Sequence, residues 1–201
     1  MAGSNIAEFA ASAERSPPDH LFVEPRWYAC YTRARSEKQV ARLLSERHIE
    51  SYLPTLPQTR QWKDRTKLVA FPLFPSYVFG RFTLRDVHAV LTTPGISTIV
   101  RTRGVPTPIP DAELENVRRV AEGLMTTGSA VVARPFFAEG ERVRVAEGPF
   151  EGVEGFVIEM RNRRRVLVGI AAIGQGLEID IDARLLRTVR NQVQCRRGGR
   201  A

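Results

Sequence analysis

The chain has 201 residues, is 43% hydrophobic and carries a formal net charge of +8. Two small domains suit this length, and no apolar run approaches the about 20 residues of a membrane-crossing helix, so we expect a soluble protein without a membrane segment. Its two cysteines, Cys30 and Cys195, stand in no paired spacing, which argues against a disulfide framework or a metal knuckle and favours the reducing cytoplasm.

The first predicted elements follow a polar start. Met1 to Glu24 lacks a cationic stretch followed by an apolar segment, so it predicts a flexible tail instead of a secretory signal. Arg26 to Thr32 is rich in Trp and Tyr and predicts a strand. Ser36 with Gln39 three residues later resembles a capping box, which predicts a helix that ends near His48.

The next segment is extended, because Pro54 and Pro57 interrupt any helix. Gln58 to Ala70 predicts a polar hairpin that leads into an aromatic strand from Tyr77 to Phe82. On that strand Tyr77 and Phe79, with Phe74, share one face, and Val78 lies on the other. Two interpretations stay open: a strand buried on both sides, or an exposed aromatic patch that receives another protein.

Both helices and strands are predicted in the middle of the chain. A short helix is predicted around Arg85 to Leu91, then a turn at Thr93 to Gly95 and a strand from Ile96 to Arg101. Asp111 is a candidate cap for a last helix with an apolar stripe, formed by Leu114, Val117, Val120 or Ala121, and Leu124. This order predicts an α+β domain with helices on an antiparallel sheet.

The remainder of the chain predicts a small β-barrel. Thr126 to Ser129 begins a linker, and short strands follow at Arg142 to Val145, Phe156 to Ile158, Val166 to Val168 and Leu177 to Ile181. Gly148, Pro149 and the many β-branched residues disfavour helix here, so we predict strands at rest, including Val157 to Ile170.

Two sets of motifs resemble one known family. The segments Trp27 to Arg33, Phe74 to Phe79 and Thr93 to Ile96 resemble the N-terminal domain of the NusG family of transcription elongation factors, and Gly140 to Gly155 resembles its KOW module. Both sets stand in the family's order. The segments Tyr52 to Pro54, Arg60 to Arg65 and Pro72 to Pro75 look more like the specialised, operon-targeted paralogues of the RfaH-like and UpxY-like kind.

This resemblance implies a fold and its divisions. The expected fold is α+β, with a NusG-type α/β sandwich followed by a KOW SH3-like β-barrel. The expected divisions are a flexible tail at 1–24, a NusG N-terminal-like domain at 25–124, a linker at 125–136, a KOW domain at 137–189 and a basic tail at 190–201.

The resemblance also implies a function. The chain is expected to bind RNA polymerase as a monomer, to suppress pausing and termination on particular operons, and to couple transcription to translation. The alternatives are a general housekeeping NusG, and a ribosome-associated or RNA-binding KOW protein without polymerase affinity. Implied partners are the polymerase clamp helices, the non-template DNA of the transcription bubble, and a small-subunit ribosomal protein or Rho at the KOW domain.

Candidate binding residues follow from the matched positions. Aromatic side chains suit protein interfaces, and the resemblance suggests that the polymerase-binding residues are Tyr31, Phe74, Pro75, Tyr77 and Phe79. Ten basic against four acidic residues lie between Arg26 and Lys67. Cations bind phosphate and an indole can stack on a base, so the candidate nucleic-acid-binding residues are Arg33, Arg35, Arg60, Trp62, Lys63, Arg65 and Lys67. The alternative for these positions is a solvated basic face.

Other candidate sites have less support in the sequence. The specialised relatives contact the gate loop of the polymerase through a His-Thr-Thr-type motif. The corresponding stretch here, His88 to Val90, lacks both threonine hydroxyls, which argues against that contact. Arg161 to Arg165 predicts a charged hairpin turn that could touch RNA. The three histidines lack partners at ligand spacing and no phosphate-binding Gly-rich loop occurs, so we expect neither an enzyme nor a cofactor or metal site.

Overall fold

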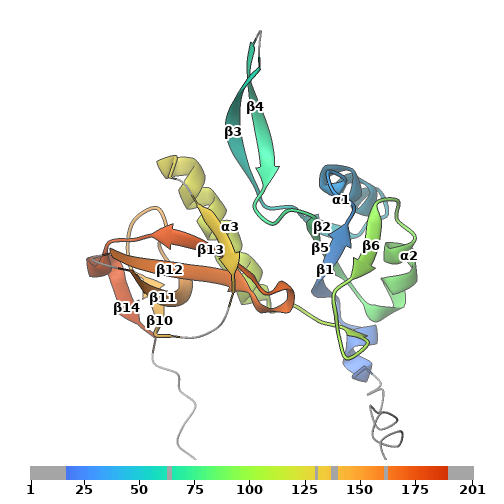
Figure 1. Cartoon of the computed structure of the whole chain (residues 1–201). Coiled ribbons are helices and arrows are strands. Elements are labelled where there is room, and N and C mark those ends of the chain that lie inside the picture. Colours follow the sequence, from blue (N-terminus) through green and yellow to red (C-terminus); the bar gives the residue numbers. More distant parts are fainter. Residues whose placement is uncertain (1–16, 63–64, 130, 137–139, 161–162, 190–201) are drawn as a thin grey trace, which may run out of the picture. The chain divides into compact units, whose positions relative to one another are not determined.

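The computed structural model describes residues 17–62, 65–129, 131–136, 140–160 and 163–189. The chain divides into two compact units, Met1–Leu53 with Ser76–Ile109 and Pro54–Pro75 with Pro110–Ala201, and each is described by itself (Figure 1). Helix α3 (Asp111–Thr127) belongs to the second unit. The sequence instead divides the domains after residue 124, and those predicted boundaries stay a prediction.

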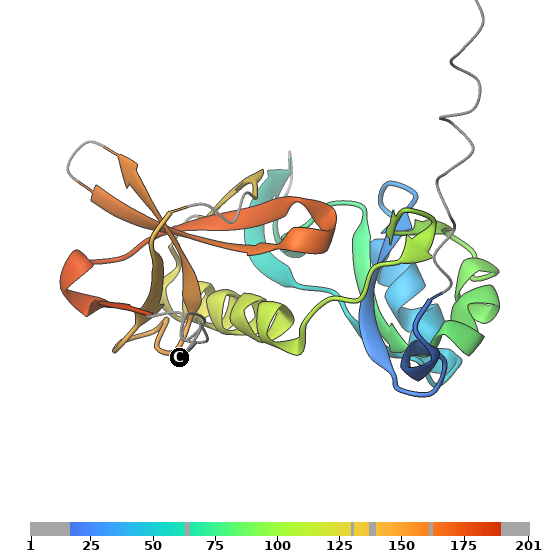
Figure 2. The same cartoon turned by 90° about the horizontal axis from the view of Figure 1, so that it is seen from below.

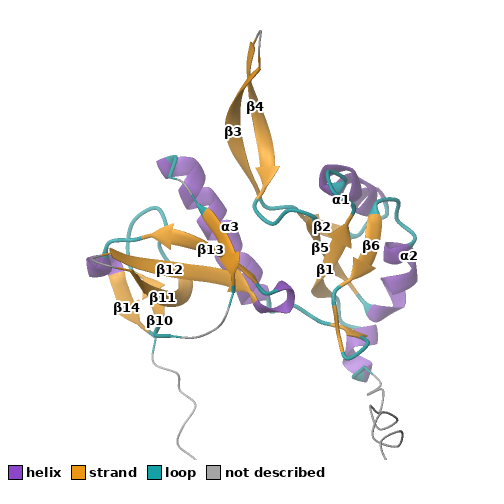
Figure 3. Ribbon diagram, viewed as in Figure 1, coloured by secondary structure: helices purple, strands orange, loops and turns teal. Residues whose placement is uncertain are grey.

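The first unit is built on a four-stranded antiparallel sheet with strand order β2-β5-β1-β6. Helices and 3-10 turns flank it, and a two-stranded ribbon follows (Figure 3). The strands are β1 (Arg26–Thr32), β2 (Glu50–Tyr52), β5 (Tyr77–Phe82), β6 (Ile96–Ile99), β7 (Arg101–Thr102) and β8 (Val105–Pro106). The helical elements are η1 (Asp19–Phe22), α1 (Glu37–Glu46), η2 (Leu84–Asp86) and α2 (Val87–Leu91).

The register of β1 with β5 assigns residues to the two faces of this sheet. Successive residues of a strand point to opposite faces. One face joins the core cluster and carries Tyr28, Cys30, Val78 and Phe82, which pack with Val40 and Leu44 of α1 and Val90 of α2. The other face carries the register pairs Trp27 with Arg81, Ala29 with Phe79, and Tyr31 with Tyr77. As predicted, Tyr77 and Phe79 lie on the opposite face of the sheet from Val78.

The ends of the helices differ from the predictions. Ser36 is the N-cap of α1 but its side chain makes no capping hydrogen bond, so the predicted capping box is wrong. A capping box forms instead at Thr83 and Asp86, ahead of α2. The folded part also begins before residue 25, because Leu21 of η1 is buried in the core cluster. At α3 the cap is Pro110, and Asp111 is the first helical residue.

The second unit combines a hairpin, helix α3 and six strands. The hairpin pairs β3 (Thr55–Trp62) with β4 (Arg65–Pro72), as the sequence predicts. The six-stranded antiparallel sheet has the order β14-β10-β11-β12-β13-β9. Its strands are β9 (Val132–Pro135), β10 (Arg142–Val145), β11 (Glu154–Met160), β12 (Arg163–Ile170), β13 (Gln175–Asp180) and β14 (Leu186–Thr188). Two 3-10 turns, η3 (Ala171–Ile173) and η4 (Ala183–Leu185), complete it.

The predicted strands are confirmed within the described residues, since the stretch from Val157 to Ile170 lies in β11 and β12 apart from residues 161–162. The predicted linker, in contrast, contains structure. Helix α3 continues to Thr127, and Val132–Pro135 pairs as β9 with β13. Figure 2 shows α3 running alongside the sheet, where it contacts β12. The fold class is α+β with an all-β C-terminal module, as predicted.

Phe136 follows β9 and packs over two glycines of the sheet. The register partners Gly169 and Gly176 lack side chains, and a Cβ on Gly169 would come within 2.1 Å of the Phe136 ring. The two glycines therefore leave the space that this ring fills, an arrangement known to stabilise glycine positions in sheets.

Candidate functional site

Tyr31 and Tyr77 form an aromatic pair on the sheet face opposite the core cluster. They are register partners on β1 and β5, and their rings meet edge to face with centroids 5.3 Å apart and planes at 66°. Tyr31 is 42% exposed and Tyr77 is half-buried. Burial, and secondly the neighbouring Tyr31, raises the pKa of Tyr77, which keeps its phenol neutral. The aromatic pair, meaning Tyr31 with Tyr77, thus offers an accessible aromatic surface.

The five residues predicted to bind polymerase differ in accessibility. Pro75 is exposed, and the aromatic pair is accessible. Phe74 and Phe79 are both 0% exposed and present no surface to a partner in this structure. Sequence alternation could not separate Phe79 from Tyr77, because both lie on the same face of β5.

The predicted nucleic-acid residues fall into two groups. Arg33 and Arg35 are exposed and follow β1, and Arg35 has a left-handed φ of 65°. The other group belongs to the hairpin, where the register pairs Arg60 with Lys67 and Trp62 with Arg65. Lys63 lies outside the described residues.

The register of the hairpin shows that four positions of the second group share one face. Positions 60 and 62 of β3 and positions 65 and 67 of β4 are opposite each other and alternate in step, so all four lie on one face of the ribbon. The opposite face carries the pairs Gln61 with Thr66 and Thr59 with Leu68, which have no charge.

The stretch that corresponds to the gate-loop motif lies in α2. His88 and Ala89 are exposed, and Val90 is buried in the core. The carbonyl oxygen of Ala89 accepts hydrogen bonds from the Arg47 guanidinium and from the hydroxyl of Thr93. This helix end is therefore held by side chains from within the unit.

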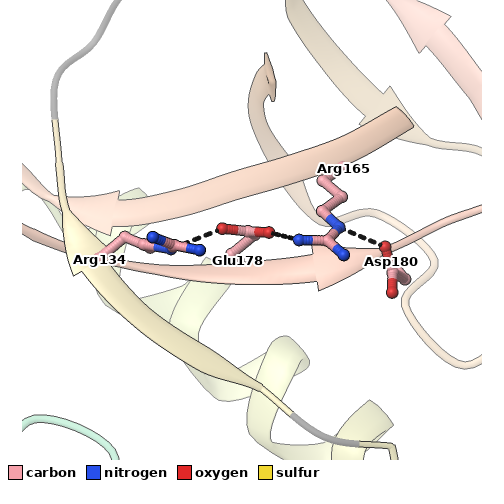
Figure 4. A network of polar contacts seen from close by, with 4 residues as sticks. All are labelled: Arg134, Arg165, Glu178 and Asp180. Atoms are coloured by element: carbon pink, nitrogen blue, oxygen red, sulfur yellow. Dashed lines mark hydrogen bonds and ion pairs between the residues drawn. The ribbon is translucent and has the colours of Figure 1, made fainter. Parts of the chain in front are cut away.

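A charged network holds β9 to the C-terminal module (Figure 4). Arg134 of β9 donates to Glu178 of β13 at 2.9 Å, and Arg165 of β12 donates both to Glu178 and, at 2.8 Å, to Asp180. The Glu178 side chain is only 5% exposed. Glu178 alternates with the apolar Leu177 and Ile179, a pattern typical of a solvated position, but in the structure its carboxylate is buried and accepts from two guanidinium groups.

Side chains of helix α3 form hydrogen bonds with backbone groups of the module. Asn116 Oδ1 accepts from the Glu154 backbone N–H at 3.0 Å, Arg119 donates to the Gly152 carbonyl at 2.9 Å, and Glu113 accepts from the Ala171 N–H at 3.0 Å. Each bond joins a side chain of α3 to a backbone group of the module. No sequence signal indicates these contacts, since the polar face of α3 predicts a solvated surface.

A cavity of about 210 Å³ lies beside these contacts. Glu113 and Asn116 line it from α3, and Phe136 and Phe156, whose ring centroids are 6.0 Å apart, line it from the module. Burial raises the pKa of Glu113, and the hydrogen bond from Ala171 opposes this shift only in part.

The remaining candidate features are Cys30, metal ligands and membrane-spanning helices. Cys30 is buried, and burial raises the pKa of its thiol to about 12. Among the described residues, no three His, Cys, Asp or Glu side chains gather as a metal would require. The helices in the described part of the chain are also too short or too polar to span a bilayer. Cys195 and the turn at residues 161–162 lie outside the described residues.

Comparisons with known proteins agree with the motifs. Residues 25–118 match the family model described as transcription termination factor nusG. The chain is 23% identical over 193 residues to the transcription termination/antitermination protein NusG of Rickettsia bellii, covering 90% of this chain and 95% of that protein. It is 29% identical over 175 residues to the NusG of Thermus thermophilus, covering 78% and 94%. A solved structure, described as domain interaction in Thermotoga maritima NusG, aligns over 83% of this chain and 98% of that one with 22% identity and a TM-score of 0.46.

Proposed function

We propose that this chain, whose residues 25–118 match the NusG family model, is a NusG-family protein that binds RNA polymerase and acts as a transcription elongation and antitermination factor. The similar proteins of Rickettsia bellii and Thermus thermophilus are both named transcription termination/antitermination protein. In this role the protein works by binding in the cytoplasm, and no bond of a substrate needs to be made or broken.

The observation that carries the proposal is the aromatic pair. Tyr31 and Tyr77 lie within the matched region, on the face of the sheet that the core cluster does not use. Rigid aromatic side chains bury a large area with little loss of rotamer freedom, so they are frequent in the centres of protein interfaces. We propose that the polymerase clamp helices pack on this pair and on Pro75, while the buried Phe79 supports the pair from within the sheet.

Nucleic acid is the second proposed contact. The hairpin face at positions 60, 62, 65 and 67 combines three cationic residues with one tryptophan. Cationic side chains bind phosphates and an indole stacks on an unpaired base, which suits single-stranded DNA. We propose that this face, with Arg33 and Arg35, contacts the non-template strand of the transcription bubble.

Binding to two parts of the transcribing polymerase would act through a population shift. A factor that binds the closed clamp better than the open, paused state lowers the fraction of paused complexes. The aromatic pair would supply affinity for the clamp, and a contact on the other side of the cleft would supply the preference for the closed state. His88 to Val90 lacks the hydroxyls of the specialised gate-loop motif, so another segment of this chain must make such a contact.

Two roles are compatible with this proposal. Action on particular operons rests on the motifs at Tyr52 to Pro54 and Arg60 to Arg65, and a general housekeeping role is favoured by the names of the similar proteins. In either role the C-terminal module would bind a ribosomal protein or Rho. Run-off transcription distinguishes the two roles when the template either contains or lacks the DNA that lies upstream of the protein's own gene. Only a specialised factor depends on that DNA.

A pull-down from the native organism, followed by mass spectrometry, tests the proposal. Recovery of polymerase subunits with the wild-type chain, and their loss with Tyr77→Ala, supports it. Recovery of ribosomal proteins without polymerase would instead support a ribosome-associated KOW protein. Circular dichroism of the variant serves as the control that its fold is intact.

A further inference from the structure

The bend before the aromatic pair is held by a buried carboxylate from helix α1. Ser76 immediately precedes Tyr77 and has a left-handed φ of 66°, a conformation that residues other than glycine rarely adopt. Its backbone N–H donates to Glu37 Oε1 at 2.8 Å, and its carbonyl oxygen accepts from the Thr32 N–H at 2.8 Å. Both polar groups of the Ser76 backbone are therefore fixed.

Glu37 is itself unusual. It is the first residue of α1, yet it is only 7% exposed, whereas a glutamate in the first turn of a helix is ordinarily solvated. A carboxylate is favoured at this end of a helix by the helix dipole. Its hydrogen bond to the Ser76 N–H leaves the helix and crosses to the residue that precedes strand β5.

The segment that leads into α1 also contacts the neighbouring loop at Gly95. Arg33 donates its backbone N–H to the Gly95 carbonyl at 2.8 Å. Gly95 has a φ of 98° and lies so close to α1 that a Cβ would come within 2.9 Å of Val40. The start of α1 is thus a fixed point, against which a bond from Glu37 can hold the bend at Ser76.

Ser76 connects this fixed point to both members of the aromatic pair. It is covalently joined to Tyr77, and its carbonyl bonds to Thr32, the residue after Tyr31. A strained backbone conformation persists only where its surroundings determine it. The hydrogen bond from the Ser76 N–H to Glu37 is one of the contacts that determine this bend.

We propose that Glu37 is a positioning residue for partner binding, which preorganises Tyr31 and Tyr77 through Ser76. This inference rests on the proposed function, because the partner is RNA polymerase bound at the aromatic pair. Preorganisation raises affinity by lowering the ordering cost on binding. Glu37 would not touch the polymerase, and its effect would pass through the orientation of Tyr77 against Tyr31, which Tyr77→Ala removes.

The test measures the affinity of the full chain for cognate RNA polymerase core enzyme, together with amide hydrogen exchange of the free chain. Glu37→Ala should weaken binding roughly three- to tenfold and speed the exchange of the Ser76 amide. Glu37→Gln keeps an acceptor oxygen of similar reach, so its affinity and Ser76 exchange should stay near wild type. The matched control is Glu46→Ala on the same helix, where the exposed carboxylate lies 3.6 Å from Arg42.

A double-mutant cycle with Tyr77→Ala separates positioning from general destabilisation. If Glu37 acts through Tyr77, then Glu37→Ala should cost almost nothing in the Tyr77→Ala background. Additive losses, or an unchanged affinity of Glu37→Ala beside a weakened Tyr77→Ala, overturn the role of Glu37 and leave the proposed function standing. No binding by the wild-type chain, or full binding by Tyr77→Ala, overturns the proposed function and this inference with it.

Discussion

The Phe150 ring lies against Gly123 of helix α3, so closely that a Cβ at position 123 would come within 2.4 Å of a ring carbon and 2.6 Å of the Pro149 carbonyl oxygen. Glycine inside a helix ordinarily costs about 1 kcal/mol relative to alanine. Its presence in the middle of α3 is explained by this close approach, which lets the helix pack on the C-terminal module.

Gly123→Ala should therefore destabilise the second unit although it favours the isolated helix. Overpacking of this kind costs about 1–3 kcal/mol, and the rigid backbone oxygen of Pro149 leaves little room to adjust. Urea unfolding measures the change, and Glu122→Ala at the exposed neighbouring position is the control. Equal or greater stability of Gly123→Ala would show that α3 does not pack on Phe150 in solution.

In the network around Glu178, the buried Glu178 should contribute more to the free energy of unfolding than the exposed Asp180. Removing the Glu178 carboxylate leaves two guanidinium groups without their shared acceptor, and we expect Glu178→Ala to cost about 2–3 kcal/mol. Asp180 is 57% exposed in its side chain, so Asp180→Ala should cost less than about 1 kcal/mol. Chemical denaturation of both variants checks the order, and equal losses would contradict the burial of Glu178.

The pH dependence of stability should include a contribution from Glu113. Because burial raises its pKa, the folded state holds this proton more tightly than the unfolded state, and stability falls as the pH rises from the unfolded pKa through the folded pKa. Glu113→Gln should remove that part of the decline while keeping an acceptor for the Ala171 N–H. Unfolding titrations between acidic and neutral pH compare the two chains, and identical pH slopes would contradict the raised pKa.

Cys30 should not react with thiol reagents while the chain is folded. Its pKa of about 12 leaves almost no thiolate near neutral pH, and the side chain is buried. In a Cys195→Ser background, a chromogenic disulfide reagent should label Cys30 only after denaturant is added. Rapid labelling of the native chain would mean that the sheet core opens.

The hairpin face should give a measurable salt effect on single-stranded DNA binding. Replacing Arg60 and Lys67 together by glutamine should lower the slope of log K against log salt by about 0.7 for each phosphate that the variant no longer binds. Replacing Lys63 and Arg65 extends the test to two further cationic residues of the same segment. The exposed Arg184 provides the control substitution, and an unchanged slope for the hairpin variants would reduce this face to a solvated one.

Much of the fold could be predicted because its signals are local. The alternation of Tyr77, Val78 and Phe79 indicated the faces of β5, and the apolar stripe of α3 from Leu114 to Leu124 marked its buried side. Thr126 to Ser129 also signalled a change of structure, but β9 could not be foreseen. Its four residues are all exposed, so its strand depends on pairing with β13 and not on its own pattern.

The candidate sites were less predictable, because burial there depends on tertiary contacts. Phe79 and Tyr77 have the same periodicity and nearly the same chemistry, yet only Tyr77 is accessible. Glu37 and Glu178 have the sequence pattern of solvated charges, and both are buried through hydrogen bonds to distant segments. Hairpin residues 60 to 67 were predicted as a cluster of charge, but the common face of positions 60, 62, 65 and 67 required the register of β3 and β4.

The most direct test of the central claim is the affinity of the full chain for RNA polymerase core enzyme, measured for wild type and Tyr77→Ala at fixed salt. We predict that the wild-type chain binds and that Tyr77→Ala loses about 1–3 kcal/mol of binding free energy, since the ring belongs to the centre of the interface. The circular dichroism spectrum of the variant should be unchanged. Equal affinity of a folded Tyr77→Ala chain would contradict polymerase binding at the aromatic pair.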